Sequence, residues 1–169
     1  MPELSSQDRL QPALLDRLTD TEPTRRHESR GCRALTRSQL RASVLRDLAY
    51  LLNSQRHADG IDAARYPLAA ASVLNYGLPG LTGRTLSGLD PVRLAHEIGE
   101  TIRRFEPRIL ADSLRVAALP RDRTRFQPGL PFLIEGVLWA QPYPEQLFYR
   151  ADLDLEAGVF HLSEGPAAT

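Results

Sequence analysis

The chain has 169 residues, and its 21 basic residues, all of them arginine, balance 21 acidic residues to a formal net charge of zero. A chain of this length buries about 70% of the surface that its unfolded form exposes, so one domain can form a core without a disulfide or a metal. The single cysteine, Cys32, excludes an internal disulfide and a cysteine-based metal site, and no apolar run approaches the roughly 18 residues of a membrane span. The amino terminus lacks a signal-peptide core, so we expect a cytoplasmic protein.

The first predicted segment is an amino-terminal extension over residues 1–37. Its apolar residues recur at helical spacing and fall on one face of a short helix: Leu10, Leu14, Leu15 and Leu18. Such a helix is too short to be stable alone, so it must dock on another surface. Two hypotheses stay open, because the helix could dock on its own domain or insert as an anchor into a groove of a partner protein.

An arginine-rich stretch follows this helix and contains no aromatic residue. Its basic residues far outnumber its acids: Arg25, Arg26, Arg30, Arg33, Arg37 and Arg41. Basic segments can bind nucleic acid, but without aromatic side chains nothing supports stacking on bases. We therefore interpret residues 21–36 as a mobile linker and predict no nucleic-acid partner. The folded domain is predicted over residues 38–162, with a tail over residues 163–169.

The first core helix is predicted over residues 38–56. Its apolar residues recur at helical spacing: Leu40, Val44, Leu45, Leu48, Leu51 and Leu52. A polar loop over residues 57–67 comes next, and residues 68–74 fit either a short helix or an extended run. The sequence Asn75-Tyr76-Gly77-Leu78-Pro79 then predicts a turn. The glycines of this region lack the spacing of a phosphate-binding loop, so we expect no cofactor.

A second helix is predicted to begin at Asp90-Pro91, because aspartate is a favourable N-cap and proline is tolerated at the first helical position. The apolar residues of this helix share one face: Leu94, Ile98, Ile102 and Phe105. The helix should end at Phe105 or Glu106, since the residue before Pro107 is disfavoured in the helical conformation.

The spacing of the apolar residues then changes to two, which predicts strands over residues 114–118, 132–140, 147–155 and 159–162. A hairpin at Glu156-Ala157-Gly158 would join the last two strands. We therefore predict an α+β fold, in which amphipathic helices pack on one face of a small antiparallel β-meander and a mobile amino-terminal extension precedes them.

Only three carboxylates cluster near a structural landmark, and they are the candidates for a glycosidase-type acid pair: Glu97, Glu100 and Glu106. Helical spacing places Arg93 four residues before Glu97 and Arg104 four residues after Glu100, so ordinary ion pairs can account for both acids. The four histidines are scattered, and no Gly-x-Ser-x-Gly motif occurs. We predict no catalytic residue, no metal site and no enzymatic activity.

The most informative motif is Glu106-Pro107-Arg108, because a proline between opposite charges ends a helix and fixes the direction of both side chains. If the two charges are partly buried, they make directional bonds to each other or across an interface. From these residues alone, an internal ion pair that fastens the helix end to the sheet is favoured, because charged turn residues are common and specific interfaces are few.

Four blocks of sequence carry a resemblance to a known family. They are Leu14-Leu15-Asp16-Arg17-Leu18; Ser43-Val44-Leu45-Arg46-Asp47-Leu48 with Leu51-Leu52-Asn53; Ser72-Val73-Leu74-Asn75-Tyr76-Gly77-Leu78-Pro79; and Ile102-Arg103-Arg104-Phe105-Glu106-Pro107-Arg108. In order and spacing these blocks resemble TssE, the baseplate subunit of type VI secretion systems, which is related to the wedge protein of contractile phage tails. The resemblance covers nearly the whole chain.

The resemblance implies a structural wedge component that assembles with TssF and TssG, lies close to TssK, and forms the platform on which the contractile sheath polymerises. It also implies that Glu106, Pro107 and Arg108 are interface residues that hold the baseplate core together. The amino-terminal block makes Leu14, Leu15 and Leu18 a second set of interface residues.

Related folds share strands between neighbouring subunits of the sheath. The resemblance therefore implies that the carboxy-terminal hairpin exposes an edge on which a strand of the sheath subunit TssB can pair. The expected location is the cytoplasm, docked at the inner membrane within the baseplate and without direct membrane insertion.

Two alternatives stay open beside this interpretation. The family carries a lysozyme-like label, so one alternative is a peptidoglycan-cleaving enzyme, although the residues themselves give that activity no support. The other alternative is a baseplate protein of a contractile phage tail.

Overall fold

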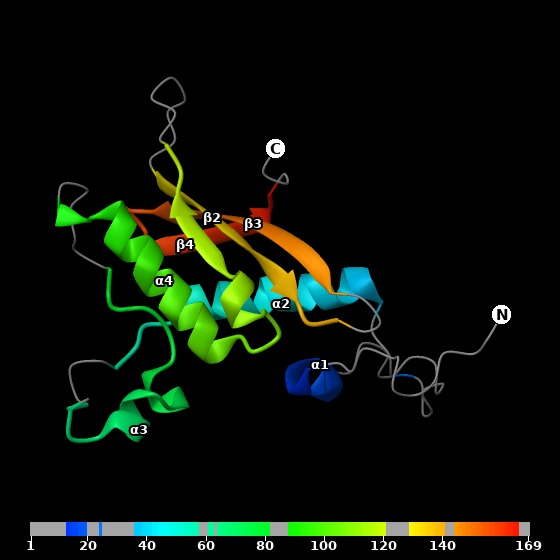
Figure 1. The fold of residues 1–169 in the computed structure, drawn as a ribbon, viewed down its shortest axis with the longest axis horizontal. Helices are drawn as coiled ribbons and strands as arrows, with labels where there is room; N and C mark the ends of the chain where they lie inside the picture. The colour runs from blue at the N-terminus through cyan, green and yellow to red at the C-terminus, as the bar shows by residue number, and fades with distance from the viewer. Residues whose placement is uncertain are drawn as a thin grey trace.

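A computed structural model gives the structure of the chain and describes residues 13–19, 24, 36–57, 61–62, 64–81, 88–120, 129–140 and 144–165. These residues form an α+β domain, which confirms the predicted fold class (Figure 1). In chain order the elements are α1 (Leu14–Leu18), α2 (Arg37–Leu52), α3 (Pro67–Ala70), the 3-10 helix η3 (Val73–Asn75), α4 (Pro91–Phe105), the 3-10 helix η5 (Ala111–Ser113), β1 (Arg115–Ala118), β2 (Gly129–Leu138), β3 (Glu145–Asp154) and β4 (Val159–Glu164). No helix in these ranges has the length and apolar character needed to cross a membrane.

The strands form one antiparallel sheet in the order β1-β2-β3-β4, which is the predicted meander. At its centre β2 and β3 pair along all ten residues of each. Alternate side chains of β3 are buried, from Leu147 to Leu153, because successive residues of a strand point to opposite faces. β4 lies at the edge and follows a hairpin in which Gly158 has a φ of 68°.

The strand boundaries differ from the predicted ones, most clearly in β2, which begins at Gly129 rather than at residue 132 and ends at Leu138. Gly129 and Pro131 favour a turn by local sequence, but the pairing with β3 holds both in the strand. The Pro131 carbonyl accepts a hydrogen bond from the Leu119 N–H at 2.8 Å, and proline keeps this acceptor although it lacks an N–H. β4 continues to Glu164, into the segment predicted as a tail.

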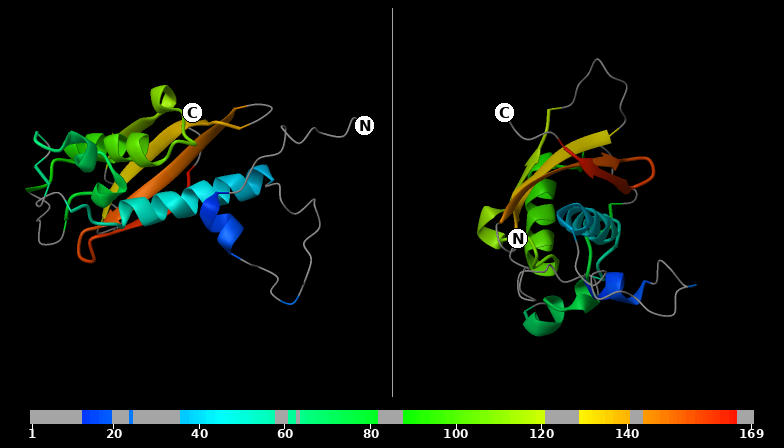
Figure 2. Two further views of the ribbon diagram at one scale, coloured as in Figure 1. Left: turned by 90° about the horizontal axis from the view of Figure 1, so that it is seen from below. Right: turned by 90° about the vertical axis from the view of Figure 1, so that its right-hand side faces the viewer.

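Helices α2 and α4 pack against the same face of the sheet, as predicted (Figure 2). Their apolar stripes meet the buried faces of β2 and β3 in one core. Fully buried members include Val44 and Leu48 from α2, Ile98 and Ile102 from α4, and Tyr149 from β3. Each large apolar side chain buried in this way contributes about 1.5–3 kcal/mol.

Capping side chains fix the ends of both long helices. Thr36 caps α2 in a capping box with Gln39, and Asp90 caps α4 by accepting a hydrogen bond from the Val92 N–H at 2.9 Å. α4 ends at Phe105, as predicted. α2 ends at Leu52, four residues before the predicted end, because the backbone after it pairs with Leu78: the Ser54 carbonyl accepts the Leu78 N–H, and the Arg56 N–H donates to the Leu78 carbonyl.

The segment between the two long helices forms a short helical protrusion. Residues 68–74, which fitted either a helix or an extended run, fall mainly within α3 and η3. The turn after them requires Gly77, whose φ is 104° and whose missing Cβ would lie 2.1 Å from the Ser54 carbonyl oxygen. That carbonyl also accepts a hydrogen bond from the Leu78 N–H at 2.9 Å, so the turn sits directly on the end of α2.

The amino-terminal extension is described at α1, where residues 14–18 are helical as predicted. Leu10 and nearly all of the predicted linker lie outside the described residues, as does Cys32.

Candidate functional site

Glu106 and Arg108 bind each other within the chain. Glu106 is 4% exposed at the end of α4, and its carboxylate accepts hydrogen bonds from Nε and Nη2 of Arg108 at 2.7 and 2.5 Å. The same carboxylate accepts the backbone N–H of Arg108 at 3.2 Å. Pro107 makes this geometry possible because it ends α4 and turns the chain back, which brings the two charges to the same side. The internal ion pair favoured from the sequence is therefore present.

The Arg108 side chain fastens this turn to α2 rather than to the sheet. Its Nη2 donates to Asp47 Oδ2 at 2.6 Å and its Nη1 donates to Ser43 Oγ at 3.1 Å. The backbone makes the contact with the sheet, because the Trp139 N–H donates to the Arg108 carbonyl at 2.8 Å. The sequence prediction of a tie to the sheet was thus correct for the backbone and wrong for the side chain.

The network extends to α1 through Arg46. The Arg46 guanidinium donates to Asp47 at 2.7 and 2.9 Å and to Asp16 Oδ1 at 2.5 Å, while Asp16 Oδ2 accepts from Ser43 Oγ at 2.8 Å. We call this set of side chains the ionic cluster: Asp16, Ser43, Arg46, Asp47, Glu106 and Arg108. It contains three carboxylates and two guanidiniums, so it carries one excess negative charge.

The charges of the cluster shift the pKa values of its members. Burial by itself lowers the pKa of the Arg108 guanidinium, but the hydrogen bonds and charges of Glu106 and Asp47 outweigh burial and raise the pKa overall. For Asp16, burial raises the pKa of the carboxyl, and the contacts with Arg46 and Ser43 lower it by more, so the net shift is downward. Both shifts show that the charged forms are the stable ones.

A pocket with a volume of about 350 Å³ opens beside the ionic cluster. It is lined by Ala13, Asp47, Leu51, Tyr76, Phe105, Glu106, Pro107 and Arg108. Tyr76 and Phe105 meet edge to face in its wall, with ring centroids 5.2 Å apart. Burial, then the charges of Asp47 and Glu106, raise the pKa of the Tyr76 hydroxyl. The pocket is thus lined by residues that lie far apart in the sequence, from Ala13 to Arg108.

The predicted leucine face of α1 is not buried. Leu14, Leu15 and Leu18 are 71%, 47% and 74% exposed, whereas Asp16 on the same helix is bound to α2. α1 therefore docks on its own domain through a polar side chain, and its apolar face stays uncovered by the described part of the chain. The hypothesis that this helix docks on its own domain is therefore confirmed, and insertion into a groove of a partner protein stays a prediction.

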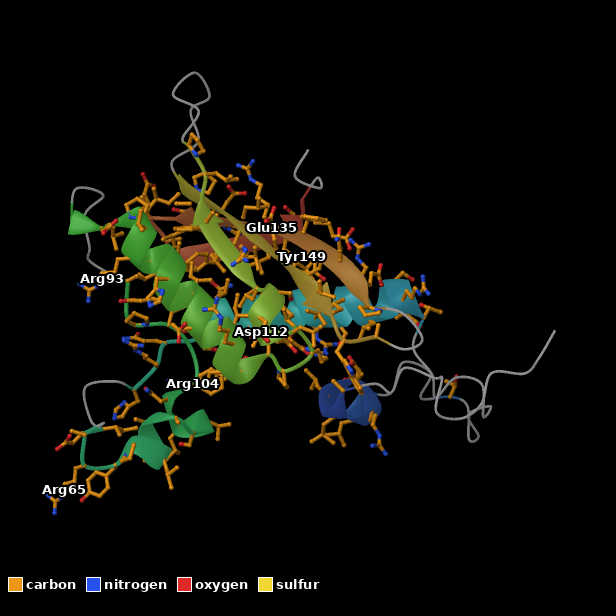
Figure 3. The ribbon with its side chains drawn as sticks, in the orientation of Figure 1. Arg65, Arg93, Arg104, Asp112, Glu135 and Tyr149 are labelled. Carbon is orange, nitrogen blue, oxygen red and sulfur yellow. The ribbon has the colours of Figure 1, made fainter. Side chains whose placement is uncertain are left out.

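The other candidate carboxylates are paired on the outer side of α4. Arg93, which Figure 3 labels, pairs with Glu97 at 3.3 Å, as predicted. Glu100 pairs with Arg103 at 2.8 Å rather than with the predicted Arg104, which donates to the Ala70 carbonyl at 3.3 Å. The Glu106 carboxylate is held by the Arg108 guanidinium, so it is not placed to donate a proton to a glycosidic oxygen. Among the described residues, no group of three or more histidine, cysteine or acidic side chains is arranged so that it could hold a metal ion.

A comparison with models of protein families identifies the family of this chain. Residues 38–143, more than half of the chain, match the family model of the baseplate wedge protein gp25. The chain belongs to the baseplate wedge protein gp25 family. Comparison with curated proteins and with solved structures gives no match. Membership in this structural family places the chain among baseplate components of contractile machines, and Glu106, Pro107 and Arg108 lie within the matched range.

Four members of the ionic cluster have no role in the sequence interpretation of this wedge protein: Asp16, Ser43, Arg46 and Asp47. Each lies inside a block that carried the resemblance, but no periodicity or spacing connects them to the motif at the end of α4. Asp47 and Arg108 are 61 positions apart, and only the packing of α4 beside α2 brings them together. A weak signal did exist, because Ser43 and Asp47 adjoin the apolar stripe of α2, where a polar side chain needs a partner once it is buried.

Proposed function

We propose that this wedge protein is the TssE-type subunit of a type VI secretion baseplate. In this proposal it assembles with TssF and TssG close to TssK, in the cytoplasm and docked at the inner membrane, and provides the platform for sheath polymerisation. The single observation that carries the proposal is the exposed leucine face of α1, presented beside the ionic cluster. A solvent-exposed cluster of leucines on a fixed helix is typical of a surface that another protein covers.

Helix α1 is also held in a fixed position on the domain. Asp16 binds Arg46 and Ser43 on α2, so the leucines are presented from a defined position. A partner that covers a pre-positioned helix avoids the entropic cost of ordering it. This favours a role for Leu14, Leu15 and Leu18 as anchors for TssF or TssG.

The Glu106-Pro107-Arg108 turn lies next to this surface and supports the same role. Its charges are satisfied within the chain, so we propose that it shapes the contact rather than forming new ion pairs across it. Pro107 is exposed and lines the pocket, and the neighbouring Trp139 is 61% exposed. Tryptophan is enriched among residues that dominate binding energy. We expect a wedge partner to cover both residues.

A second contact is proposed at β4, which forms one edge of the sheet and is separated from α1 by α2 (Figure 2). An edge strand has backbone N–H and C=O groups that can pair with a strand of another protein. We propose that a strand of the sheath subunit TssB pairs there and so begins the sheath on the wedge.

The wedge contact is tested by co-purification of the full chain with TssF and TssG. A double change of Leu14→Asp and Leu18→Asp should reduce the recovered complex about tenfold or more, because two exposed anchors are lost from the interface. The melting temperature should stay unchanged, since neither leucine is buried. Val92→Asp is the matched control, because Val92 is 74% exposed in the first turn of α4.

Two results would overturn the wedge contact. One is full recovery of the complex with the double change, and the other is an equal loss with Val92→Asp. A baseplate of a contractile phage tail stays a second candidate, because the family description names the wedge and not the machine. Recovery of phage-tail baseplate proteins in place of TssF and TssG would favour that candidate.

A further inference from the structure

The side chain of Asn53 covers part of the free edge of β4. Its Oδ1 accepts a hydrogen bond from the Phe160 N–H at 2.8 Å, and its Nδ2 donates to the Phe160 carbonyl at 3.0 Å. A primary amide carries both a donor and an acceptor, as a backbone peptide group does. Asn53 therefore binds Phe160 as the backbone of a neighbouring strand would.

The register of the sheet shows which other groups of β4 face the same edge. In an antiparallel ladder, successive residues direct their N–H and C=O groups alternately toward one neighbour and away from it. The Gly165 N–H donates to the Phe148 carbonyl at 2.9 Å, so residue 165 faces β3, as do residues 163, 161 and 159. Phe160, Leu162 and Glu164 then face the free edge, where no further strand pairs in the described part of the chain.

We infer that Asn53 closes this edge at Phe160, so that an incoming strand pairs only from Leu162 onward. This inference rests on the proposed pairing of a sheath strand with β4, and it assigns the register of that pairing. Within the described part of β4, an incoming strand gains the N–H and C=O groups of Leu162 and Glu164. The blocked position at Phe160 also shortens the edge available to a second copy of this chain, which limits unwanted edge-to-edge association.

The charges at the open end of the edge indicate the chemistry of the incoming strand. Arg41 of α2 lies 3.3 Å from Glu145 and 3.6 Å from Glu164, so one guanidinium serves two carboxylates. Oε2 of Glu145 is buried and has no hydrogen-bond partner among the described residues. The excess negative charge favours a strand that carries a basic residue opposite Glu164 and an apolar residue opposite the half-buried Leu162.

Hydrogen exchange of the full chain tests the role of Asn53 without any partner. Asn53→Ala should make the Phe160 amide exchange about tenfold faster, because its acceptor is removed. Asn53→Asp keeps the acceptor but turns a carboxylate oxygen toward the Ala49 and Phe160 carbonyls, so the protection of that amide should fall between the values of the wild type and Asn53→Ala. Ser54→Ala is the matched control, since it removes a side-chain hydrogen bond to Tyr50 at the same helix end without touching β4. Equal protection of Phe160 in the wild type and in Asn53→Ala would overturn the inference.

The second measurement adds purified sheath subunits, TssB with its sheath partner. In the wild type, binding should protect the amides of Leu162 and Glu164 and leave Phe160 unchanged. In Asn53→Ala, Phe160 should also become protected, because the pairing can extend over it. Protection of Phe160 alone in the variant, without Leu162 and Glu164, would overturn the assigned register. No protection of any β4 amide in either protein would overturn the proposed sheath pairing itself.

The proposed basic residue on the incoming strand is tested by reversing the charge of Glu164. Glu164→Lys should weaken sheath binding about fivefold, because it opposes a basic residue on the incoming strand. Glu156→Lys makes the same change of charge in the exposed hairpin at the other end of β4 and should have little effect. Equal weakening by both variants would overturn the assignment of a basic residue opposite Glu164.

Discussion

The guanidinium of Arg108 lies 2.6 Å from the carboxylate of Asp47, and this contact joins the turn after α4 to the middle of α2. The same guanidinium holds Glu106, the most deeply buried acid that the structure describes in this region. A single arginine therefore connects the two long helices on the surface where the amino-terminal helix also docks.

Arg108→Ala should lower the free energy of unfolding by about 3 kcal/mol, because it leaves Glu106 buried without its main partner. Since domains of this size have about 5–15 kcal/mol of stability, the variant should still fold. Urea denaturation of the full chain measures the loss. Arg93→Ala is the control, because Arg93 forms only an exposed pair with Glu97 and should cost less than about 1 kcal/mol.

The same pair of residues can be tested for coupling. Combining Arg108→Ala with Glu106→Gln should cost less than the sum of the two single changes, because the second change removes the stranded charge. Additive losses would show that the two side chains do not depend on each other.

In cells, Arg108→Ala should also abolish sheath formation if the turn shapes the wedge contact.

Asp16→Asn should release α1 from the domain without unfolding the domain. The carboxylate of Asp16 binds Arg46, whose charge it balances, and a neutral amide weakens this contact. Trypsin cleavage after Arg17 should become about tenfold faster, which corresponds to a loss of roughly 1.4 kcal/mol in docking. Asp152→Asn, which breaks the pair with Arg150 on β3, is the control and should leave cleavage at Arg17 unchanged.

Acidification should have the same effect as Asp16→Asn. The pKa of Asp16 is lowered in the folded chain, so its stabilising contribution is present above the ordinary aspartate pKa of about 4 and is lost as the pH falls through the lower folded value. Amide chemical shifts of α1 should report undocking in that acid range. Undocking between pH 5 and 8 instead would contradict a role for this carboxylate.

Gly77→Ala should destabilise the chain by at least about 2 kcal/mol. Gly77 has a φ of 104°, and an added Cβ would lie 2.1 Å from the Ser54 carbonyl oxygen, so the turn would have to leave the end of α2. Gly99→Ala in α4 should act in the opposite direction, because its nearest contact would be 3.4 Å and alanine favours a helix by up to about 1 kcal/mol. Thermal denaturation distinguishes the two, and equal effects would contradict this account.

Tyr149 should make the fold sensitive to alkali. Burial raises the pKa of its hydroxyl from 10.0 to about 12, and the hydroxyl donates to the Arg41 carbonyl at 2.9 Å. Because the folded pKa is the higher one, stability is fully present below pH 10 and falls as the pH rises toward 12, by roughly 3 kcal/mol in total. In Tyr149→Phe this part of the pH dependence should disappear, which urea denaturation between pH 9 and about 12 would measure.

Local sequence predicted much of the fold because its signals act over short distances. The caps of α4, the apolar stripes of both long helices and the alternation in β3 each depend on neighbouring residues, and each appears in the structure. The element boundaries that were predicted wrongly depend instead on contacts with distant residues. Gly129 and Pro131 lie in β2 against their local preference because pairing with β3 holds them there. α2 stops early because the backbone after it pairs with Leu78.

The candidate site likewise has features that local sequence predicts and contacts that depend on tertiary structure. The sequence alone determined that a proline between two charges ends α4, and that leucines gather on one face of a short helix, because both follow from local geometry. Only the tertiary structure decided that Arg108 bonds to Asp47 across 61 positions, that Asp16 holds α1 while its leucines stay exposed, and that Asn53 covers the edge of β4. The reason is physical: hydrogen bonds and ion pairs act over a few ångströms, and packing alone determines which distant residues come that close.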